Sequence, residues 1–453
     1  MQSDGPASTS ATAGSLEATT APGVAAPGVA TLRPGRAQRL GLDALGYGPF
    51  RTFFGASLVS NTASFVLSAG LSWTVLESTG SAASVGLVGF LYALPFALFT
   101  LHAGLLTDRF GSRRMVGVSL VGGGIVTLVL GALALVFPVP LLVLGVLALA
   151  IGAVSVLGSP GGISIVNDLV PRSVVPSAVA LIFLDVNAGR IIGGLLAGLT
   201  LALWPSGVTM LLAGVMLLLP ALAIWRLPIR DPEVPAGGGR SLVGPLADAA
   251  GYARRDPILG TLLVLAIVPG ALGLSFNYLL PVAAHELDFG SDGLGVWIAA
   301  AGVGGLFTAL FGARIMHRLG HGRAVLTGIA TIAAGLIWFG LSSGLAMGAV
   351  AMVVAGAGFA LYASSSLSLI QSLSSTEYRG RLTAVFALLY WGLMPIGALI
   401  GGAMAEAIGA QQALLVSGAL VGLAGVLAFV IRPSIASVRA TADEPARMAG
   451  SAS

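Results

Sequence analysis

The stretch Gly104-Leu-Leu-Thr-Asp-Arg-Phe-Gly-Ser-Arg-Arg114 separates two long apolar runs, which start near residues 83 and 116. Its eleven residues carry four charges and two glycines. Charged groups are costly in hydrocarbon, so we expect this stretch to form a tight loop at a membrane surface. The chain on either side of the loop should then consist of membrane-spanning helices.

The residues of this 104–114 loop have distinct expected tasks. Gly104 would let a helix end approach its neighbour closely, and Gly111 would supply the positive φ of a short turn. Asp108 would accept hydrogen bonds from an adjacent helix N-terminus. The basic residues that would anchor the loop on the cytoplasmic side are Arg109, Arg113 and Arg114.

The composition excludes most soluble functions. Of the 453 residues, 56% are hydrophobic and only 9% are charged, whereas a soluble domain carries roughly a quarter charged residues. All 22 basic residues other than histidine are arginines, and the chain has no cysteine, which excludes disulfides and thiol catalysis. The net charge of +4 is too small to favour a nucleic-acid partner. We find no Walker loop, metal-ligand cluster or nucleophile–base arrangement, so we expect neither an enzyme nor a bound cofactor.

Apolar runs of about 20 residues, enough to cross about 30 Å of hydrocarbon, recur along the chain. The predicted spans of the first half are about 53–76, 83–106, 116–137, 141–166, 175–203 and 207–225. Those of the second half are about 258–283, 291–313, 324–342, 346–370, 382–405 and 411–431. The predicted organisation is a disordered tail (1–51), a six-helix half (52–226), a linker (227–257), a second half (258–431) and a second disordered tail (432–453). We expect one amphipathic helix in the linker, around Leu242–Ala253.

The arginines indicate the orientation. If both termini are cytoplasmic, 21 of the 22 arginines lie in the tails or in cytoplasmic loops. The opposite loops contain no arginine, as positive-inside asymmetry requires. We therefore expect Ser81 and Ser343 outside the cell membrane and Ser241 inside.

The two halves also repeat. Arg190-Ile-Ile-Gly-Gly-Leu-Leu-Ala-Gly198 lies 204 residues before Met394-Pro-Ile-Gly-Ala-Leu-Ile-Gly-Gly402. Asp108-Arg-Phe-Gly111 lies 209 residues before His317-Arg-Leu-Gly320. The histidine in the second copy indicates that any gate is stronger in the first half.

The 104–114 loop closely resembles the signature of the major facilitator superfamily, G-x-L-x-D-R-x-G-R-[RK]. The matching residues are Gly104, Leu106, Asp108, Arg109, Gly111 and Arg113, while Ser112 replaces a basic residue. The resemblance implies an all-α polytopic membrane protein, with twelve transmembrane helices in two six-helix pseudo-repeats and a substrate site between them. It also implies a transporter that works as a monomer by alternating access in the lipid bilayer.

Three further runs resemble the branch that contains macrolide efflux proteins and the enterobactin exporter. They are Leu76-Glu-Ser-Thr-Gly-Ser81, Asp168-Leu-Val-Pro-Arg172 and Tyr378-Arg-Gly-Arg-Leu382. One departure concerns the fourth span, where members often have a basic residue and a glutamine after Ser-Pro. Here Ser159-Pro160 is followed by glycines, so the substrate is expected to differ from those of better-known members.

The fifth span resembles the antiporter signature G-x-x-x-G-P-x-x-G-G. The residues of this strip are Gly189, Arg190, Gly193, Gly194 and Gly198, with Gly194 at the proline position. In the family the strip seals the contact between the halves of exporters. The alternative is ordinary close packing through small residues.

Asp185 and Arg190 are expected at depth in the same span. Five residues turn a helix by about 140°, so the two side chains should not pair along their own helix. Asp185 is the first candidate for a proton carrier, and His102 is the second. Burial favours a protonated carboxyl and a nearby arginine favours an ionised one, so the charge state stays open. The alternative is a solvated Asp185 that has no role in coupling.

The resemblance suggests which polar and aromatic residues line the substrate cavity. The candidates are Asn61, Asn277, Tyr278, Tyr362 and Trp391. Inter-helix hydrogen bonding or core packing is the alternative role for each of them. The leading hypothesis is a secondary exporter of amphipathic small molecules, such as drug-like compounds or siderophores, driven by proton antiport. An uptake symporter of the same fold and a non-transporting sensor or scaffold are the alternatives.

Overall fold

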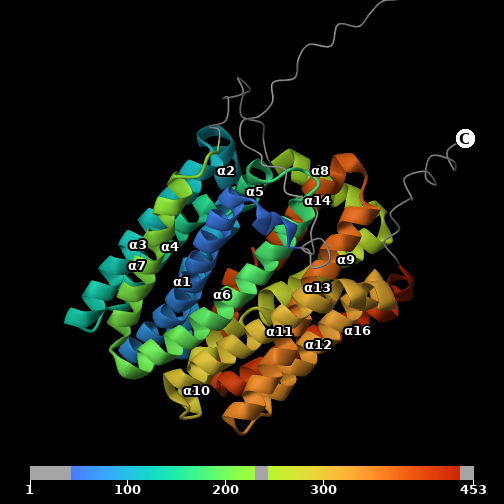
Figure 1. Cartoon of the computed structure of the whole chain (residues 1–453). Coiled ribbons are helices and arrows are strands. Elements are labelled where there is room, and N and C mark those ends of the chain that lie inside the picture. The colour runs from blue at the N-terminus through green and yellow to red at the C-terminus, as the bar shows by residue number, and fades with distance from the viewer. Residues whose placement is uncertain (1–41, 230–242, 439–453) are drawn as a thin grey trace, which may run out of the picture.

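The structure is a computed structural model that describes residues 42–229 and 243–438, where all regular structure is helical (Figure 1). Twelve segments of this described part are long and apolar enough to cross a membrane. The N-terminal half contains α1 (Gly48–Thr79), α2 (Ala82–Phe110), α3 (Ser112–Val136), α4 (Leu141–Ser155), α5 (Gly161–Leu169), α6 (Val175–Leu203) and α7 (Ser206–Trp225). The C-terminal half contains α9 (Pro257–Val268), α10 (Phe276–Glu286), α11 (Gly290–Leu319), α12 (His321–Gly340), α13 (Leu345–Leu373), α14 (Thr376–Tyr390), α15 (Met394–Ile408) and α16 (Ala410–Ile431).

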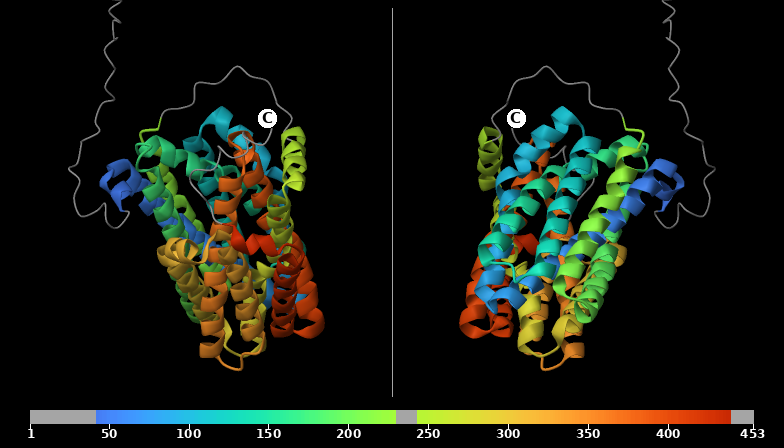
Figure 2. Two further views of the ribbon diagram at one scale, coloured as in Figure 1. Left: turned by 90° about the vertical axis from the view of Figure 1, so that its right-hand side faces the viewer. Right: turned by 90° about the vertical axis from the view of Figure 1, so that its left-hand side faces the viewer.

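The linker helix α8 (Val243–Arg255) lies at the same end of the bundle as α5 and α14 (Figures 1 and 2). We call this end the linker side and the opposite end, where α10 finishes, the distal side. The ring of Tyr252 on α8 stacks on Tyr378 of α14 with centroids 4.5 Å apart. The expected amphipathic helix is therefore confirmed. Most of the predicted tails, and the linker around Ser241, fall outside the described residues.

Three predicted spans are interrupted rather than continuous. The fourth is broken by a 3₁₀ turn (Val156–Gly158) before α5, the seventh by a π-helical turn (Pro269–Gly273) between α9 and α10, and the eleventh between α14 and α15. Each break contains or adjoins a proline, which removes a backbone donor and clashes with the preceding turn. Apolar run length is insensitive to such breaks, so continuous spans were predicted.

The 104–114 loop is shorter than predicted. Helix α2 continues through Asp108 to Phe110, and α3 begins at Ser112, so Gly111 alone forms the turn. Its φ of 90° lies in the region that favours glycine. Gly320 forms the same turn between α11 and α12 with φ of 83°, so the expected role of Gly111 is confirmed and is repeated in the second half.

Two helix pairs make the most extensive contacts between the halves, α2 with α15 and α6 with α11. A methyl group added at Gly86 would lie 2.8 Å from Cα of Gly402, and one added at Gly295 would lie 2.8 Å from Cα of Gly198. These two crossings are equivalent by the internal repeat, because Gly295 follows Gly86 by 209 residues and Gly402 follows Gly198 by 204. We call them the distal seal. Backbones can approach this closely only where side chains are absent.

The elements of the linker side have their main neighbours within their own half. Helix α5 packs on α3 and α6, whereas α14 packs on α8, α9 and α13. The contacts that join the halves lie instead toward the distal side, where Trp73 meets His285 with ring centroids 6.5 Å apart. The structure is therefore closed on the distal side and has its halves separated on the linker side.

Candidate functional site

The centre of the candidate site is Asp185, a fully buried carboxyl in the middle of α6. One of its oxygens, Oδ2, accepts hydrogen bonds from the Ser57 hydroxyl and from the Asn61 amide, the latter at 3.1 Å. Both donors lie on α1, one helical turn apart, so they present two polar groups to the same point. The other oxygen, Oδ1, has no hydrogen-bond partner among the described residues.

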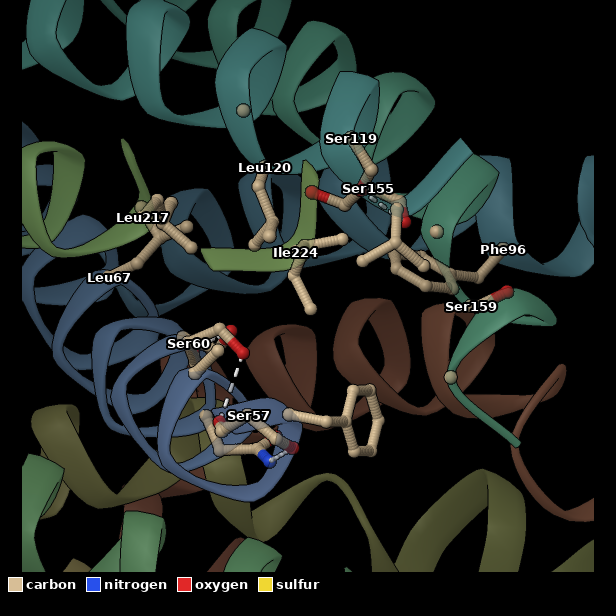
Figure 3. A pocket seen from close by; sticks show the side chains of 18 of the residues that line it. Ser57, Ser60, Leu67, Phe96, Ser119, Leu120, Ser155, Ser159, Leu217 and Ile224 are labelled. Atoms are coloured by element: carbon tan, nitrogen blue, oxygen red, sulfur yellow. Dashed lines mark hydrogen bonds between the residues drawn. The ribbon is translucent and has the colours of Figure 1, made fainter. Parts of the chain in front are cut away.

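A cavity of about 340 Å³ adjoins these donors in the N-terminal half. Ser57 and Ser60 lie on one wall of it (Figure 3), and Asn61 also lines it. The Ser119 hydroxyl on the opposite wall donates to the carbonyl of Ser155 at 3.2 Å. The remaining wall is largely apolar and includes Phe96. The cavity therefore combines apolar surface with a few polar groups, as small-molecule sites do.

Small residues bring α6 against α1 beside this cavity. A methyl group added at Gly189 would lie 2.8 Å from Cβ of Asn61, and one added at Gly193 would lie 2.6 Å from the Thr62 carbonyl oxygen. On the other face of α6, one added at Gly194 would lie 2.8 Å from a side-chain carbon of Ile298. The antiporter-like strip thus has two faces. One places Asp185 against α1, and the other, through Gly194 and Gly198, contacts α11 of the opposite half.

Arg190 lies one turn beyond Asp185 on α6 and is partly exposed. Its guanidinium carbon lies 4.9 Å from the ring centre of Phe65 and 5.9 Å from that of Phe276. Phe65 belongs to α1 and Phe276 to α10, so the cation lies between the halves. Within the described residues it makes no ion pair or hydrogen bond, and Asp185 does not pair with it.

The energetic balance for Arg190 is unfavourable. An arginine at the centre of a span costs about 2.5–3.5 kcal/mol on insertion scales. A partly exposed cation–π contact returns about 0.5–1 kcal/mol, and Phe276 lies near the limit of that interaction. Ring contacts alone therefore do not stabilise Arg190 enough to explain its position.

Aromatic side chains of the C-terminal half form a cluster near this cation. The Tyr390 ring lies 5.6 Å from Phe386, 5.5 Å from Tyr362 and 4.9 Å from Trp391, measured between centroids. Tyr390 is a neighbour of Arg190. Tyr362 is fully buried, while Trp391 is 54% exposed. Of these two predicted cavity residues, only Trp391 is accessible in this conformation.

The other predicted cavity residues are less directly placed. The Tyr278 ring packs against Gly89 of α2, where an added methyl group would lie 2.5 Å from it, and its hydroxyl is buried without a partner among the described residues. The Asn277 amide donates to the Leu274 carbonyl at 3.0 Å within its own segment. Asn61 is thus the predicted cavity residue that both lines the cavity and bonds Asp185.

His102, the second candidate for a proton carrier, is exposed on α2. Its ring meets that of Phe99 with centroids 6.2 Å apart. It does not line the cavity described above. No group of three acidic, histidine or cysteine side chains suited to a metal occurs in the residues that the structure covers.

The residues of the 104–114 loop differ in their surroundings. Asp108 is exposed and has no hydrogen bond or ion pair within residues 42–229 and 243–438. A methyl group added at Gly104 would meet nothing within 4 Å, so the close approach expected there is absent in this conformation. Arg109 covers the ring of Phe110 at 5.2 Å, and Arg113 donates to the Leu227 carbonyl at 3.2 Å. Arg114 is exposed at the start of α3.

The sequence analysis did not single out several of these residues: Ser57, Phe65, Phe276 and Tyr390. Serine is common in membrane helices, where it usually bonds its own backbone, so Ser57 carries no distinctive signal. The spacing of Ser57 and Asn61, one helical turn apart, was the one sequence feature that indicated a shared polar face. Phe65 and Phe276 come together only because the halves meet.

Comparison with known proteins covers most of the chain. The model of the family described as Transmembrane secretion effector matches residues 41–449. The Multidrug efflux pump Tap of Mycolicibacterium fortuitum is 24% identical over 84% of this chain and 95% of that protein. The Macrolide efflux protein A of Streptococcus pyogenes is 23% identical over 82% of this chain and 93% of that protein. The Staphyloferrin A transporter of Staphylococcus aureus (strain NCTC 8325 / PS 47) is 24% identical over 59% of this chain and 68% of that protein.

Solved structures confirm the predicted fold. A bacterial homologue of the human lysosomal transporter Spinster, inward-facing and unoccupied, superposes with a TM-score of 0.65 at 16% identity, over 87% of this chain and 99% of that one. The nucleoside transporter NupG superposes with a TM-score of 0.66 at 12% identity, over 85% and 99%. The identities are low and establish the fold alone, whereas the family match covers nearly the full length. The chain therefore belongs to the Transmembrane secretion effector family, within the major facilitator superfamily of membrane transporters.

Proposed function

We propose that this transporter exports amphipathic small molecules from the cytoplasm in exchange for protons, and that Asp185 carries the proton. The observation that supports this most directly is the geometry of Asp185. It is a buried carboxyl on α6 with two donors on one oxygen and no partner on the other among the described residues. The relatives named for efflux support the export direction.

Binding of a proton would neutralise the negative charge of the Asp185 carboxylate. An ionised carboxyl deep in a span costs several kcal/mol unless it is paired, and no cation of the described residues contacts Asp185. Protonation at Oδ1 would remove the charge and leave both hydrogen bonds to Oδ2 in place. Release of that proton when the halves rock would couple its movement to a change of access.

The orientation is part of the proposal. If both termini are cytoplasmic, the linker side faces the cytoplasm and the structure is inward-facing. Cysteines introduced at Ser81 and Ser343 should then react with an impermeant thiol reagent in intact cells, while one at Ser241 should not. The chain has no cysteine of its own, so labelling is free of background. Labelling of position 241 in intact cells would reverse the orientation.

The coupling experiment uses proteoliposomes with an imposed pH gradient. Wild-type protein should move substrate against its gradient, and Asp185→Asn should bind substrate but lose uphill transport. Asp292→Asn is the matched control, because Asp292 is exposed on the distal side. Uphill transport by Asp185→Asn at the wild-type rate would exclude Asp185 as the coupling site, and His102 and Glu406 would then be tested in that order.

The substrate and the transport direction need a separate measurement. A host that lacks its own pumps should become less sensitive to drugs or to siderophore toxicity when it expresses this chain. An uptake symporter would instead increase sensitivity or accumulation. A non-transporting sensor or scaffold would change neither accumulation nor the pH of loaded vesicles.

A further inference from the structure

Arg190 is a deep cation whose hydrogen-bond donors are unused. Within the described residues its guanidinium makes no ion pair and no hydrogen bond, although it carries five N–H donors and keeps its charge in proteins. The nearest acidic residue on its helix, Asp185, is bonded instead to Ser57 and Asn61. No acidic group in the part of the chain that the structure describes therefore neutralises this positive charge.

The position of the cation suits a ligand rather than the protein core. The side chain is partly exposed, and the phenyl faces of Phe65 and Phe276 hold it from opposite halves. The preceding residue, Gly189, lies against Asn61, which belongs to the cavity wall. A group bound at Arg190 would thus contact both halves, as a substrate must in alternating access.

We propose that Arg190 binds an oxyanion of the transported molecule, so that the substrate class is a small molecule with a carboxylate or similar group on an apolar body. The guanidinium fork would take the oxyanion through paired N–H donors, which is the geometry in which arginine binds such groups best. The half-buried Phe65 and the exposed Trp391 would pack against the apolar body, while the buried Phe276 supports the cation from the other half. This inference rests on the proposed transport function and specifies its substrate.

The charges at Arg190 balance when an oxyanion is bound. Asp185 is bonded to Ser57 and Asn61 and does not pair with Arg190 among the described residues, so the guanidinium donors are left to the substrate. The site then holds one cation and one substrate anion, and no further counter-ion is required.

The site is tested by measuring how a charged probe and its uncharged analogue bind to purified full-length protein. The probes are naphthoate and naphthamide, which share a ring system and differ in charge. Wild-type protein should bind naphthoate saturably, measured by tryptophan fluorescence and thermal stabilisation, and naphthamide at least about tenfold more weakly, as expected for loss of a charge-assisted pair. Equal affinity for the two probes, or binding of neither, would overturn the inference without any variant.

Variants then assign the effect to Arg190. Arg190→Gln should lower naphthoate affinity to that of naphthamide, while Arg190→Lys should restore part of the difference because it keeps the charge without the fork. Arg314→Gln is the matched control, because Arg314 is exposed, lies 5.9 Å from the ring centre of Phe311 and is outside the site; it should keep discrimination between the probes. If Arg190→Gln still bound naphthoate more tightly than naphthamide by the wild-type factor, another residue would bind the carboxylate. Binding does not depend on proton coupling or export, so its failure is distinguishable from failure of the proposed function.

Discussion

Helix α6 and its repeat counterpart, the α14–α15 pair, are alike at the distal side and different at mid-depth. Gly198 and Gly402 occupy equivalent positions, and each touches a glycine of the opposite half. The positions that correspond to Asp185 and Arg190, at the same offset of 204 residues, are Leu389 and Met394. Both halves therefore contribute equivalent glycines to the distal seal, whereas the two charged residues of the candidate site, Asp185 and Arg190, belong to the N-terminal half alone.

Helix continuity separates the two regions further. Helix α6 runs unbroken from Val175 to Leu203 and holds its two charges on one rigid element. The counterpart is interrupted between Tyr390 and Met394. The interruption places Tyr390 and Trp391 near the level of Arg190, so the second half contributes aromatic surface where the first contributes charge.

The largest expected effect comes from breaking the shared seal. In Gly86→Ala the new methyl group would lie 2.5 Å from the Ala398 carbonyl oxygen, and in Gly295→Ala it would lie 2.7 Å from that of Gly194. Backbone atoms cannot move aside locally, so both variants should lose the distal-closed state and nearly all transport. Transport in proteoliposomes and labelling of a cysteine in the cavity from the distal side would measure this.

The matched control for the seal is Gly55→Ala on α1, where the added methyl group would meet nothing within 4 Å. It should transport normally. Equal loss in Gly86→Ala and Gly295→Ala would support a seal shared by the halves. Normal transport in either variant would show that the two crossings are alike in structure but are not both needed for transport.

The second prediction compares the two copies of the helix turn on the linker side. Asp108→Asn should cut transport severely and leave membrane insertion unchanged, because Asp108 is exposed, makes no bond to the described residues here and would form its bonds only in the opposite state. His317→Asn, at the equivalent position of the second half, should have a much smaller effect. Similar losses in both variants would contradict a gate that is stronger in the first half.

Most of the fold could be predicted from the sequence. The thickness of the bilayer fixes the length of each apolar span, and the arginines indicate which loops lie on the same side of the membrane. The family match and solved structures confirm the fold. Repeats at offsets of 204 and 209 residues also anticipated the equivalent crossings of Gly86 with Gly402 and Gly198 with Gly295. The interruptions in the fourth, seventh and eleventh spans were missed, because proline and glycine are tolerated within continuous membrane helices as well.

The candidate site was only partly predictable. Asp185, Arg190 and Asn61 stood out because polar residues are rare in apolar spans. Their partners did not, since the register of α1 against α6 and the approach of Phe276 to Arg190 depend on tertiary contacts. Sequence spacing placed Asp185 and Arg190 on different faces of one helix, and the absence of an ion pair between them in the described part agrees with it.

The third prediction concerns the hydrogen bond from Ser57 to Asp185. Ser57→Ala removes one of two donors to the carboxyl, so proton-coupled transport should fall by roughly fivefold, the effect of one net hydrogen bond. Ser60→Ala is the matched control, because the Ser60 hydroxyl donates to the Ser57 backbone carbonyl and not to Asp185. Equal losses in the two variants, measured in proteoliposomes, would assign the effect to α1 packing instead.

The smallest expected effect on transport comes from the hydrogen bonds of Glu406, which lie beside the glycine crossings of the distal seal. Glu406 on α15 accepts hydrogen bonds from the Ser81 hydroxyl at 3.0 Å and from the Ala83 backbone N–H at 3.1 Å, so it caps α2 across the halves. Glu286 accepts from the Ala410 N–H at 2.8 Å and caps α16 within one half. The partial positive charge of a helix N-terminus stabilises both carboxylates. Only the contact of Glu406 with α2 joins the two halves, so only this contact must break when the distal side opens.

Glu406→Gln should therefore shift the protein slightly toward the distal-open state, while Glu286→Gln should not. A cysteine at Ser64, which lines the cavity, reports this shift through its labelling rate by an impermeant reagent applied from the distal side. Because Glu406 is exposed and glutamine keeps an acceptor oxygen, transport should stay within about twofold of wild type. Faster labelling in both variants would mean that helix capping, and not the contact between halves, sets the equilibrium. Unchanged labelling in Glu406→Gln would leave the glycine crossings as the whole of the seal.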